Sequence, residues 1–343
     1  MAKPLVVSLI PNKRYHQVMT PEAESLLTSF AEYQKYDGAQ MTEAEVAAAL
    51  APADGCLTSW GLRPFSAETI AQAKKLRIIG HAAGSVRKLV PPESYDQVVV
   101  LSASPLIAKS VGEMAFGMII AARRQFVRHH NAFATQGTRG DTVLYPSGDY
   151  SHNHGLHHTK IGLIGASATG RYLLRFLKAY EDDIEILIYD PYLSAEDAEI
   201  LGVRKAELDE LLSSCDVVSL HAPLNEKTAG MIGRREVKLM KDGALLVNTA
   251  RGGLIDHEAL YEELATGRIY AALDVYLETL RDAQCAASPY RKLPNVLITP
   301  GMAGPTIEVS RTLGLHIIRD MQTFFSGGRP RYQVLREKLT YIA

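Results

Sequence analysis

The sequence has few cysteines and almost no net charge, and both absences exclude classes of protein. Its 343 residues contain only three cysteines, Cys56, Cys215 and Cys285. Because they are odd in number and far apart, a disulfide framework is not expected. The formal net charge is −1, so electrostatics give no reason to expect nucleic acid or an anionic membrane as a partner.

Long apolar runs and metal-ligand clusters are also lacking. No stretch approaches the roughly 18 uninterrupted apolar residues of a membrane span, and MAKPLVVSLIPNKRYH at the N-terminus is typical of a strand and a polar loop rather than a signal peptide. The histidines of SHNHGLHH (151–158) have no cysteine or acidic residue at ligand spacing, which favours a solvated loop over a metal site. We expect a cytoplasmic protein without a metal.

Short apolar runs alternate with helical patterns along most of the chain. Such alternation predicts parallel sheets with helices on both faces, and the length favours two domains. Two long helices are also predicted, one over 108–133 and one over 306–326. The first is apolar on nearly all sides, so we expect it to be buried between domains or subunits. The expected strands are 5–10, 55–59, 76–80, 97–101, 161–164, 184–189, 217–220, 244–248, 270–275 and 296–299, and the first helices are 21–33, 42–50 and 67–75.

The stretch KIGLIGASATGRYLLRFLKAYEDDIEILIYD, from Lys160 to Asp190, contains the main motif. An apolar strand ends at Gly165, a helical pattern follows from Gly170, and a second strand ends in Asp190. This is a βαβ unit of about thirty residues, the context that a dinucleotide-binding fingerprint requires.

The turn in this unit has the residue types that a pyrophosphate needs. Gly165 permits a sharp turn and Gly170 permits close packing of the helix, while the N–H groups at Ser167, Ala168 and Thr169 face an anion. Asp190 is placed to accept hydrogen bonds from the adenosine ribose and to repel a 2′-phosphate, so NAD is favoured over NADP. Ser167 replaces the middle glycine of G-x-G-x-x-G, and a turn that binds nothing is the alternative.

Five further segments carry a resemblance to a known family. SVGEMAFGMIIAARR, CDVVSLHAPLNEKTAGMIG, LMKDGALLVNTARGGLID, AALDVY and LPNVLITPGMAG closely resemble the D-isomer-specific 2-hydroxyacid dehydrogenases. The resemblance implies a Rossmann NAD-binding domain, residues 106–304, inserted in a flavodoxin-like substrate domain formed by 1–105 and 305–343. It also implies a 2-oxo or 2-hydroxy acid substrate bound in the cleft between the domains, and a homodimer.

The resemblance assigns roles to individual residues. Arg251 follows a buried strand and matches the arginine that grips the substrate's carboxylate and carbonyl oxygen and polarises the carbonyl. Asp274 matches the residue that binds the nicotinamide carboxamide, and His221 is cofactor-proximal or structural. The positions matching the family's cofactor lining are Pro223, Thr228 and Thr249.

The loop IIGHAAGS resembles the family's substrate-carboxylate loop. Ala83, Gly84 and Ser85 would present backbone N–H groups to the carboxylate, and small residues suit such a close approach. The family pattern continues with an aspartate where this chain has Val86, so an ordinary strand-to-helix turn is the alternative.

The acid–base half of the family site is altered. Gly301 stands in TPGMAG where the family has its proton-donating histidine, and Thr279 stands at the position of the carboxylate that holds it. Glu278, one residue early, is the remaining catalytic candidate, and His81, His129 or His130 are histidines from elsewhere in the chain. Two functions stay open: an NAD-dependent oxidoreductase with an atypical proton donor, of which formate-type chemistry is a variant, and a catalytically silent NAD(H)-binding sensor or scaffold.

Overall fold

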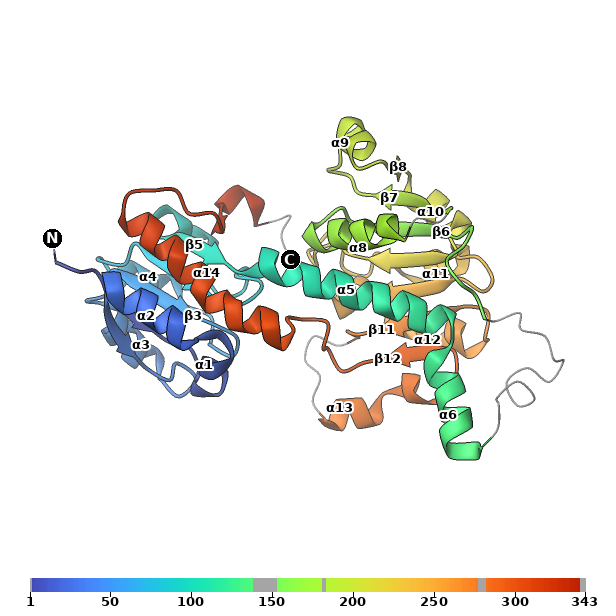
Figure 1. Ribbon diagram of the computed structural model, residues 1–343, viewed down its shortest axis with the longest axis horizontal. Coiled ribbons are helices and arrows are strands. Elements are labelled where there is room, and N and C mark those ends of the chain that lie inside the picture. The colour runs from blue at the N-terminus through green and yellow to red at the C-terminus, as the bar shows by residue number, and fades with distance from the viewer. Residues whose placement is uncertain (1, 138–152, 181–182, 277–281, 340–343) are drawn as a thin grey trace. The chain divides into compact units, whose positions relative to one another are not determined.

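The computed structural model describes residues 2–137, 153–180, 183–276 and 282–339 (Figure 1). The chain divides into two compact units. Unit 1 comprises Met1–Ala108 and Pro305–Ala343, and unit 2 comprises Lys109–Gly304. Each unit is built on its own sheet, so each is described by itself.

Unit 1 has a six-stranded sheet in the order β13-β5-β4-β3-β1-β2. All neighbours pair in parallel except β13, which is antiparallel to β5. The parallel part has the flavodoxin-like strand order 2-1-3-4-5. The strands are β1 (Leu5–Ser8), β2 (Glu32–Lys35), β3 (Gly55–Thr58), β4 (Ile78–His81), β5 (Val99–Ser102) and β13 (Gln333–Val334).

The helices of unit 1 other than α1 begin at polar capping residues. Thr20 and Ser66 accept hydrogen bonds from the first turns of their helices, and Thr42 forms a capping box with Glu45. The C-terminal helix α14 (Ile307–Phe325) packs against α1, α2 and the strands β4 and β5. The others are α1 (Asn12–Val18), α2 (Pro21–Phe30), α3 (Glu43–Leu50) and α4 (Ala67–Gln72).

Unit 2 has a seven-stranded, fully parallel sheet in the order β12-β11-β10-β9-β6-β7-β8. Its order reverses between β6 and β9, the point at which open α/β sheets bind ligands. The predicted fold class, two doubly wound parallel-sheet domains, is confirmed. The strands are β6 (Lys160–Ile164), β7 (Glu185–Tyr189), β8 (Arg204–Lys205), β9 (Val217–Leu220), β10 (Leu245–Asn248), β11 (Tyr270–Leu273) and β12 (Val296–Ile298).

Helices cover both faces of this sheet (Figure 1). Buried residues form two apolar clusters, one including Leu211, Leu246 and Leu260 and the other including Ile119, Leu163 and Leu174. The helices are α5 (Ser104–Arg123), α6 (Phe126–Gln136), α8 (Ala168–Ala179), α9 (Ala195–Ile200), α10 (Leu208–Ser214), α11 (Arg234–Leu239), α12 (His257–Ala265) and α13 (Asp282–Ala287).

The predicted single helix over 108–133 is wrong. The structure divides it into α5 and α6, because Gln125 takes a left-handed conformation with φ of 50° and breaks the helical hydrogen bonding. Within this single chain 39% of the most apolar window of α5 is buried, and the expected burial between domains or subunits stays a prediction. By length and composition alone, α5 is long and apolar enough to cross a membrane. Core helices of soluble proteins also meet these two criteria.

Candidate active site

In unit 2 the residues expected to bind cofactor or substrate follow five neighbouring strands, β7, β6, β9, β10 and β11. The carboxyl ends of parallel strands lie at one edge of a sheet, so these residues lie along one edge of unit 2. In strand order they are Asp190 after β7, Gly165–Gly170 after β6, His221 and Pro223 after β9, Thr249 and Arg251 after β10, and Asp274 after β11.

Two glycines are required by the way the β6–α8 turn packs. Gly165 has a φ of +103°, and a Cβ there would lie 2.8 Å from the backbone nitrogen of Ala222 and the carbonyl carbon of His221. A Cβ on Gly170 would lie 2.5 Å from the carbonyl oxygen of Gly165. The turn therefore lies directly on the chain that leaves β9, which keeps the space at the switch point narrow and lined by backbone.

Ser167 is the N-cap of α8. Its hydroxyl accepts a hydrogen bond from the Gly170 N–H at 3.3 Å, so the side chain is directed at the first helical turn. Ala168 and Thr169 are the first two helical residues, whose N–H groups have no intrahelical acceptor. These donors and the positive end of α8 fit a pyrophosphate, with serine in place of the middle glycine.

Asp190 is bound to the same turn. One carboxylate oxygen accepts from the Ala166 N–H at 2.7 Å and the other accepts from the Tyr192 N–H at 2.8 Å. Each carboxylate oxygen has capacity for a further hydrogen bond. The carboxylate is thus fixed by backbone and is still able to accept from ribose hydroxyls.

Two buried polar side-chain atoms at this edge, His221 Nδ1 and Thr249 Oγ1, lack partners among the described residues. His221 is 3% exposed; its Nε2 lies 2.9 Å from the Ser219 hydroxyl, and its Nδ1 has no partner. Thr249 is 5% exposed and its Oγ1 has none. Burial lowers the pKa of His221 to about 4, so the imidazole is neutral at pH 7. Because buried polar atoms normally find partners, a polar ligand at this edge fits both.

Arg251 is held by its backbone at the end of β10. Asn248 Oδ1 accepts from the Ala250 N–H at 3.0 Å, and Asn248 Nδ2 donates to the Arg251 carbonyl at 2.9 Å. The guanidinium donates to the Ala250 carbonyl at 2.7 Å through Nη1. The arginine is half-buried, and a guanidinium has five N–H donors.

Asp274 has a structural function that the sequence did not reveal. It is 2% exposed. One oxygen accepts from the Thr299 hydroxyl at 2.6 Å and the Met302 N–H at 2.8 Å, and the other from the Ala303 N–H at 2.9 Å. The carboxylate therefore holds the loop that contains Gly301, which is exposed and has a φ of +77°. Among the described residues, the oxygen facing Ala303 has one partner and the other oxygen has two, so the first is the better placed to accept from a carboxamide.

Pro223 and Thr228 lie at the two ends of a closed turn. The Thr228 hydroxyl donates to the Pro223 carbonyl at 2.6 Å and accepts from the Asn225 N–H at 2.9 Å. The Thr228 side chain thus shapes the backbone after β9, and a contribution to cofactor binding would come from the turn as a whole.

The loop after β4 in unit 1 turns its carbonyls toward hydroxyl donors. Ser102 donates to the Gly84 carbonyl at 2.6 Å and Ser59 donates to the Ala82 carbonyl at 3.2 Å. Across the described parts of the chain, the N–H groups of Ala83, Gly84 and Ser85 have no acceptor. Val86 is fully buried in the core of unit 1 and cannot stand in for a carboxylate. The loop thus forms a small nest of donors suited to an anion.

The alternative proton donors are placed unfavourably or lie outside the described residues. Glu278 belongs to the segment 277–281, outside the described residues. His81 is 4% exposed, with Nδ1 2.9 Å from the Thr58 hydroxyl, and burial lowers its pKa to about 4. It is therefore neutral at pH 7 and a poor proton donor.

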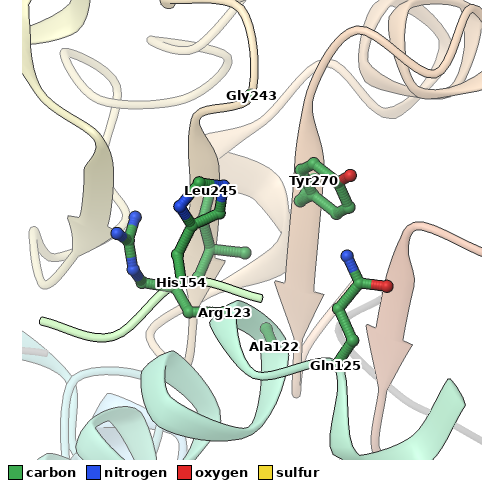
Figure 2. Close-up of a pocket in the computed structure, with 7 residues that line it drawn as sticks. All are labelled: Ala122, Arg123, Gln125, His154, Gly243, Leu245 and Tyr270. Atoms are coloured by element: carbon green, nitrogen blue, oxygen red, sulfur yellow. The ribbon is translucent and has the colours of Figure 1, made fainter. Parts of the chain in front are cut away.

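His129 and His130 lie on α6, which starts beside the opposite edge of the unit 2 sheet. A small cavity there is lined from the amino ends of β10 and β11 (Figure 2). Its lining includes Leu245 and Tyr270, the first residues of these strands, together with Gln125, which immediately precedes α6. These histidines therefore do not approach Arg251 through the sheet edge that carries it.

Comparisons with known proteins identify the family of the chain. Residues 116–303 match the family model of the D-isomer specific 2-hydroxyacid dehydrogenase, NAD binding domain. The chain is 33% identical over 274 residues to the D-3-phosphoglycerate dehydrogenase of Archaeoglobus fulgidus, covering 76% of this chain and 47% of that protein. It is 32% identical over 260 residues to the hydroxypyruvate reductase of Thermotoga maritima, and the match covers 74% of this chain and 79% of that protein.

Solved structures show the same fold. A protein from Pyrococcus horikoshii has a TM-score of 0.79 at 24% identity, covering 98% of this chain and 96% of that one. A phosphoglycerate oxidoreductase from Rhizobium etli has a TM-score of 0.76 at 25% identity, covering 97% and 99%. The chain spans about half the length of the phosphoglycerate dehydrogenases it matches. It belongs to the family of D-isomer-specific 2-hydroxyacid dehydrogenases, and unit 2 contains the NAD-binding domain of that family.

Proposed function

We propose that the protein is an NAD-dependent oxidoreductase acting on a 2-hydroxy or 2-oxo acid, with a proton donor other than the usual histidine. NAD bound at the carboxyl edge of unit 2 supplies or accepts the hydride. The observation that carries the proposal is Arg251, a half-buried arginine fixed by Asn248 at the same edge as the glycine turn and Asp190.

Arg251 has the chemistry that a 2-oxo acid requires. A guanidinium can bind a carboxylate and a neighbouring carbonyl oxygen together, and its charge stabilises the negative charge that develops on that oxygen. The N–H groups of Ala83, Gly84 and Ser85 are proposed to bind the substrate carboxylate.

The silent NAD(H)-binding protein is the second candidate, and Gly301 favours it. The position is exposed, left-handed and without a side chain, and Asp274 is committed to holding its loop. A positioned general acid contributes about 10²–10⁴ in rate. A protein that lacks one entirely would bind NADH but reduce 2-oxo acids very slowly.

The deciding experiment measures NADH oxidation with a panel of 2-oxo acids and titrates NADH binding in parallel. We expect turnover with at least one acid, loss of that turnover in Arg251→Ala, and no change in the control Arg311→Ala, an exposed residue of α14. NADH binding without turnover would favour the silent protein. Absence of NADH binding would contradict both candidates.

Trp60 provides a separate test of the substrate-carboxylate loop. It is the only tryptophan in the chain, is half-buried, and follows Ser59, whose hydroxyl donates to Ala82. Oxamate, an unreactive analogue of a 2-oxo acid, is expected to change Trp60 fluorescence in a saturable way. The signal should be absent in Trp60→Phe, and no change in the wild-type protein would contradict carboxylate binding at Ala83–Ser85.

The protein is also proposed to form a homodimer. Exposed apolar residues gather on α6, where Phe126, Val127 and Phe133 are 53%, 50% and 70% exposed. Covering them would remove apolar surface from water. Light scattering after gel filtration is expected to give twice the 37.6 kDa chain mass, and Phe133→Glu should shift the protein toward the monomer. A monomeric wild-type protein would contradict this proposal.

A further inference from the structure

The turn that carries Arg251 is held on its far side by a half-buried histidine, His257, and a buried tyrosine, Tyr290. Two glycines, Gly252 and Gly253, follow the arginine directly. Glycine is the residue with the greatest backbone freedom, so this sequence alone does not fix the direction of the turn. Hydrogen bonds from side chains must therefore fix the conformation of the turn. Asn248 fixes only the part that directly follows β10.

His257 fixes the other end of the Arg251–Gly253 turn through Gly252. Its Nε2 lies 3.0 Å from the Gly252 carbonyl oxygen, which also accepts from the Ile255 N–H. A carbonyl only accepts, so Nε2 must carry the proton. In the neutral ring Nδ1 is then an acceptor, and the Tyr290 hydroxyl lies 2.9 Å from it. The bonds run from Tyr290 to His257 to Gly252.

Tyr290 is itself firmly placed. It is 2% exposed on the short helix Pro289–Lys292, and its ring packs edge-on against Tyr276 and Tyr261 at centroid distances of 5.8 and 6.1 Å. Its single hydroxyl proton is shared between His257 Nδ1 and the His257 carbonyl oxygen, which lies 3.0 Å from the hydroxyl. Burial raises the pKa of Tyr290, so the hydroxyl stays protonated, and burial lowers the pKa of His257, which favours the neutral ring.

We propose that His257 and Tyr290 are positioning residues that order the Arg251–Gly253 turn and thereby direct the guanidinium toward the 2-oxo acid. Neither is expected to touch substrate or cofactor. The inference rests on the proposed function for its catalytic consequence, while the order of the turn is a property of unit 2 that is measurable without turnover.

Three variants distinguish the effect of these hydrogen bonds from an effect of packing alone. His257→Phe keeps a planar ring and removes both nitrogens, Tyr290→Phe removes only the hydroxyl, and His257→Gln restores an N–H donor toward Gly252. Tyr261→Phe is the matched control, because its ring belongs to the same cluster and its hydroxyl takes no part in these bonds.

The first readout is hydrogen–deuterium exchange of the amides from 251 to 256. We expect faster exchange in His257→Phe and Tyr290→Phe, confined to this segment, with His257→Gln and Tyr261→Phe close to wild type. Unchanged exchange in His257→Phe would overturn the proposal whatever the activity.

The second readout is steady-state kinetics. Loss of one buried hydrogen bond corresponds to about a tenfold effect. We expect kcat/KM for the 2-oxo acid to fall about tenfold in His257→Phe, mostly through KM, with the dissociation constant of NADH unchanged. Faster exchange with wild-type kinetics would reduce the pair to a structural role and overturn the proposal. If the wild-type protein reduces no 2-oxo acid, the proposed function fails, and the exchange rates alone then decide whether the pair orders the turn.

Discussion

Asp190 accepts a hydrogen bond from the backbone N–H of Ala166 at 2.7 Å, which ties the end of β7 to the glycine turn after β6. The residue expected to bind ribose is therefore also a support for the residues expected to bind pyrophosphate. The Gly165 N–H donates to the Tyr189 carbonyl at 2.9 Å and strengthens the same connection. The shape of the glycine turn thus depends on the Asp190 carboxylate, and we predict that cofactor selection depends on the same group.

Replacing Asp190 with asparagine tests this double role. The amide keeps one acceptor oxygen but loses the charge and presents N–H donors to Ala166 or Tyr192. A hydrogen bond to a charged group contributes about 1.5–3 kcal/mol, so the dissociation constant of NADH should rise at least about tenfold. The affinity for NADPH should fall less, because the repulsion between the Asp190 carboxylate and the 2′-phosphate of NADPH is removed. Fluorescence titration of both nucleotides measures this, and Asp197→Asn, exposed on α9, is the control. Equal losses for the two nucleotides would contradict the selective role of the charge.

Gly165→Ala is expected to damage the phosphate turn more than an equivalent change elsewhere. The variant combines a left-handed φ of +103° with a Cβ 2.8 Å from backbone atoms of His221 and Ala222. Gly243→Ala is the matched control, since Gly243 has a φ of +77° and nothing within 4 Å of its Cβ position. Left-handed strain alone costs about 1–2 kcal/mol. Chemical denaturation should show a clearly larger loss of stability for Gly165→Ala, together with loss of NADH binding. Equal losses of stability in Gly165→Ala and Gly243→Ala would show that the close approach of Gly165 to the chain after β9 is unimportant.

His81 is expected to make the stability of unit 1 dependent on pH. Its pKa falls from 6.5 to about 4 on burial, so below pH 6.5 the unfolded chain binds a proton that the folded chain does not. Stability is then fully present above pH 6.5 and falls as the pH decreases toward 4, by up to about 1.4 kcal/mol per unit. Urea unfolding followed by Trp60 fluorescence at pH 7 and pH 5 measures it. His81→Gln should show a smaller decrease than wild type, and an equal decrease would contradict the assignment.

Strong periodicity made most of the fold predictable. The predicted apolar runs at 161–164, 184–189 and 217–220 overlap β6, β7 and β9. Buried parallel strands are nearly continuous apolar runs, so their sequences identify them. The C-terminal helix also ends within one residue of its predicted limit, because Thr306 caps its start and Gly327 follows its end.

The elements that were missed have weak or misleading sequence signals. The strand β2 is EYQK, an edge strand with three of four residues exposed, and α1 is the polar NKRYHQV without a side-chain cap. Backbone pairing with β1 and burial of Tyr15 and Val18 decide these elements. The break at Gln125 was missed because glutamine is a good helix former and nothing in its neighbourhood signals a left-handed residue.

The candidate site was located by motifs, but its internal bonds were not. The contact from Asp274 to the 299–303 loop joins residues 25–29 positions apart, and that from Tyr290 to His257 joins residues 33 apart. Such contacts depend on how loops fold back over a sheet edge, which periodicity does not encode. The roles of the individual site residues are still predictions.

Gly301→His tests whether the rest of the site is competent for reduction. A histidine here must adopt a φ of +77°, which costs about 1–2 kcal/mol, but the loop is already held by Asp274 and the position is exposed. If the remaining residues bind a 2-oxo acid productively, an imidazolium near the carbonyl oxygen should raise kcat by about 10²-fold or more. Gly301→Asn is the control, because asparagine tolerates the left-handed conformation and cannot act as an acid. An increase in both variants would point to loop rigidity rather than proton donation. No increase in either, with NADH binding intact, would favour the silent NAD(H)-binding protein, since hydride transfer would then be limited by something other than the missing acid.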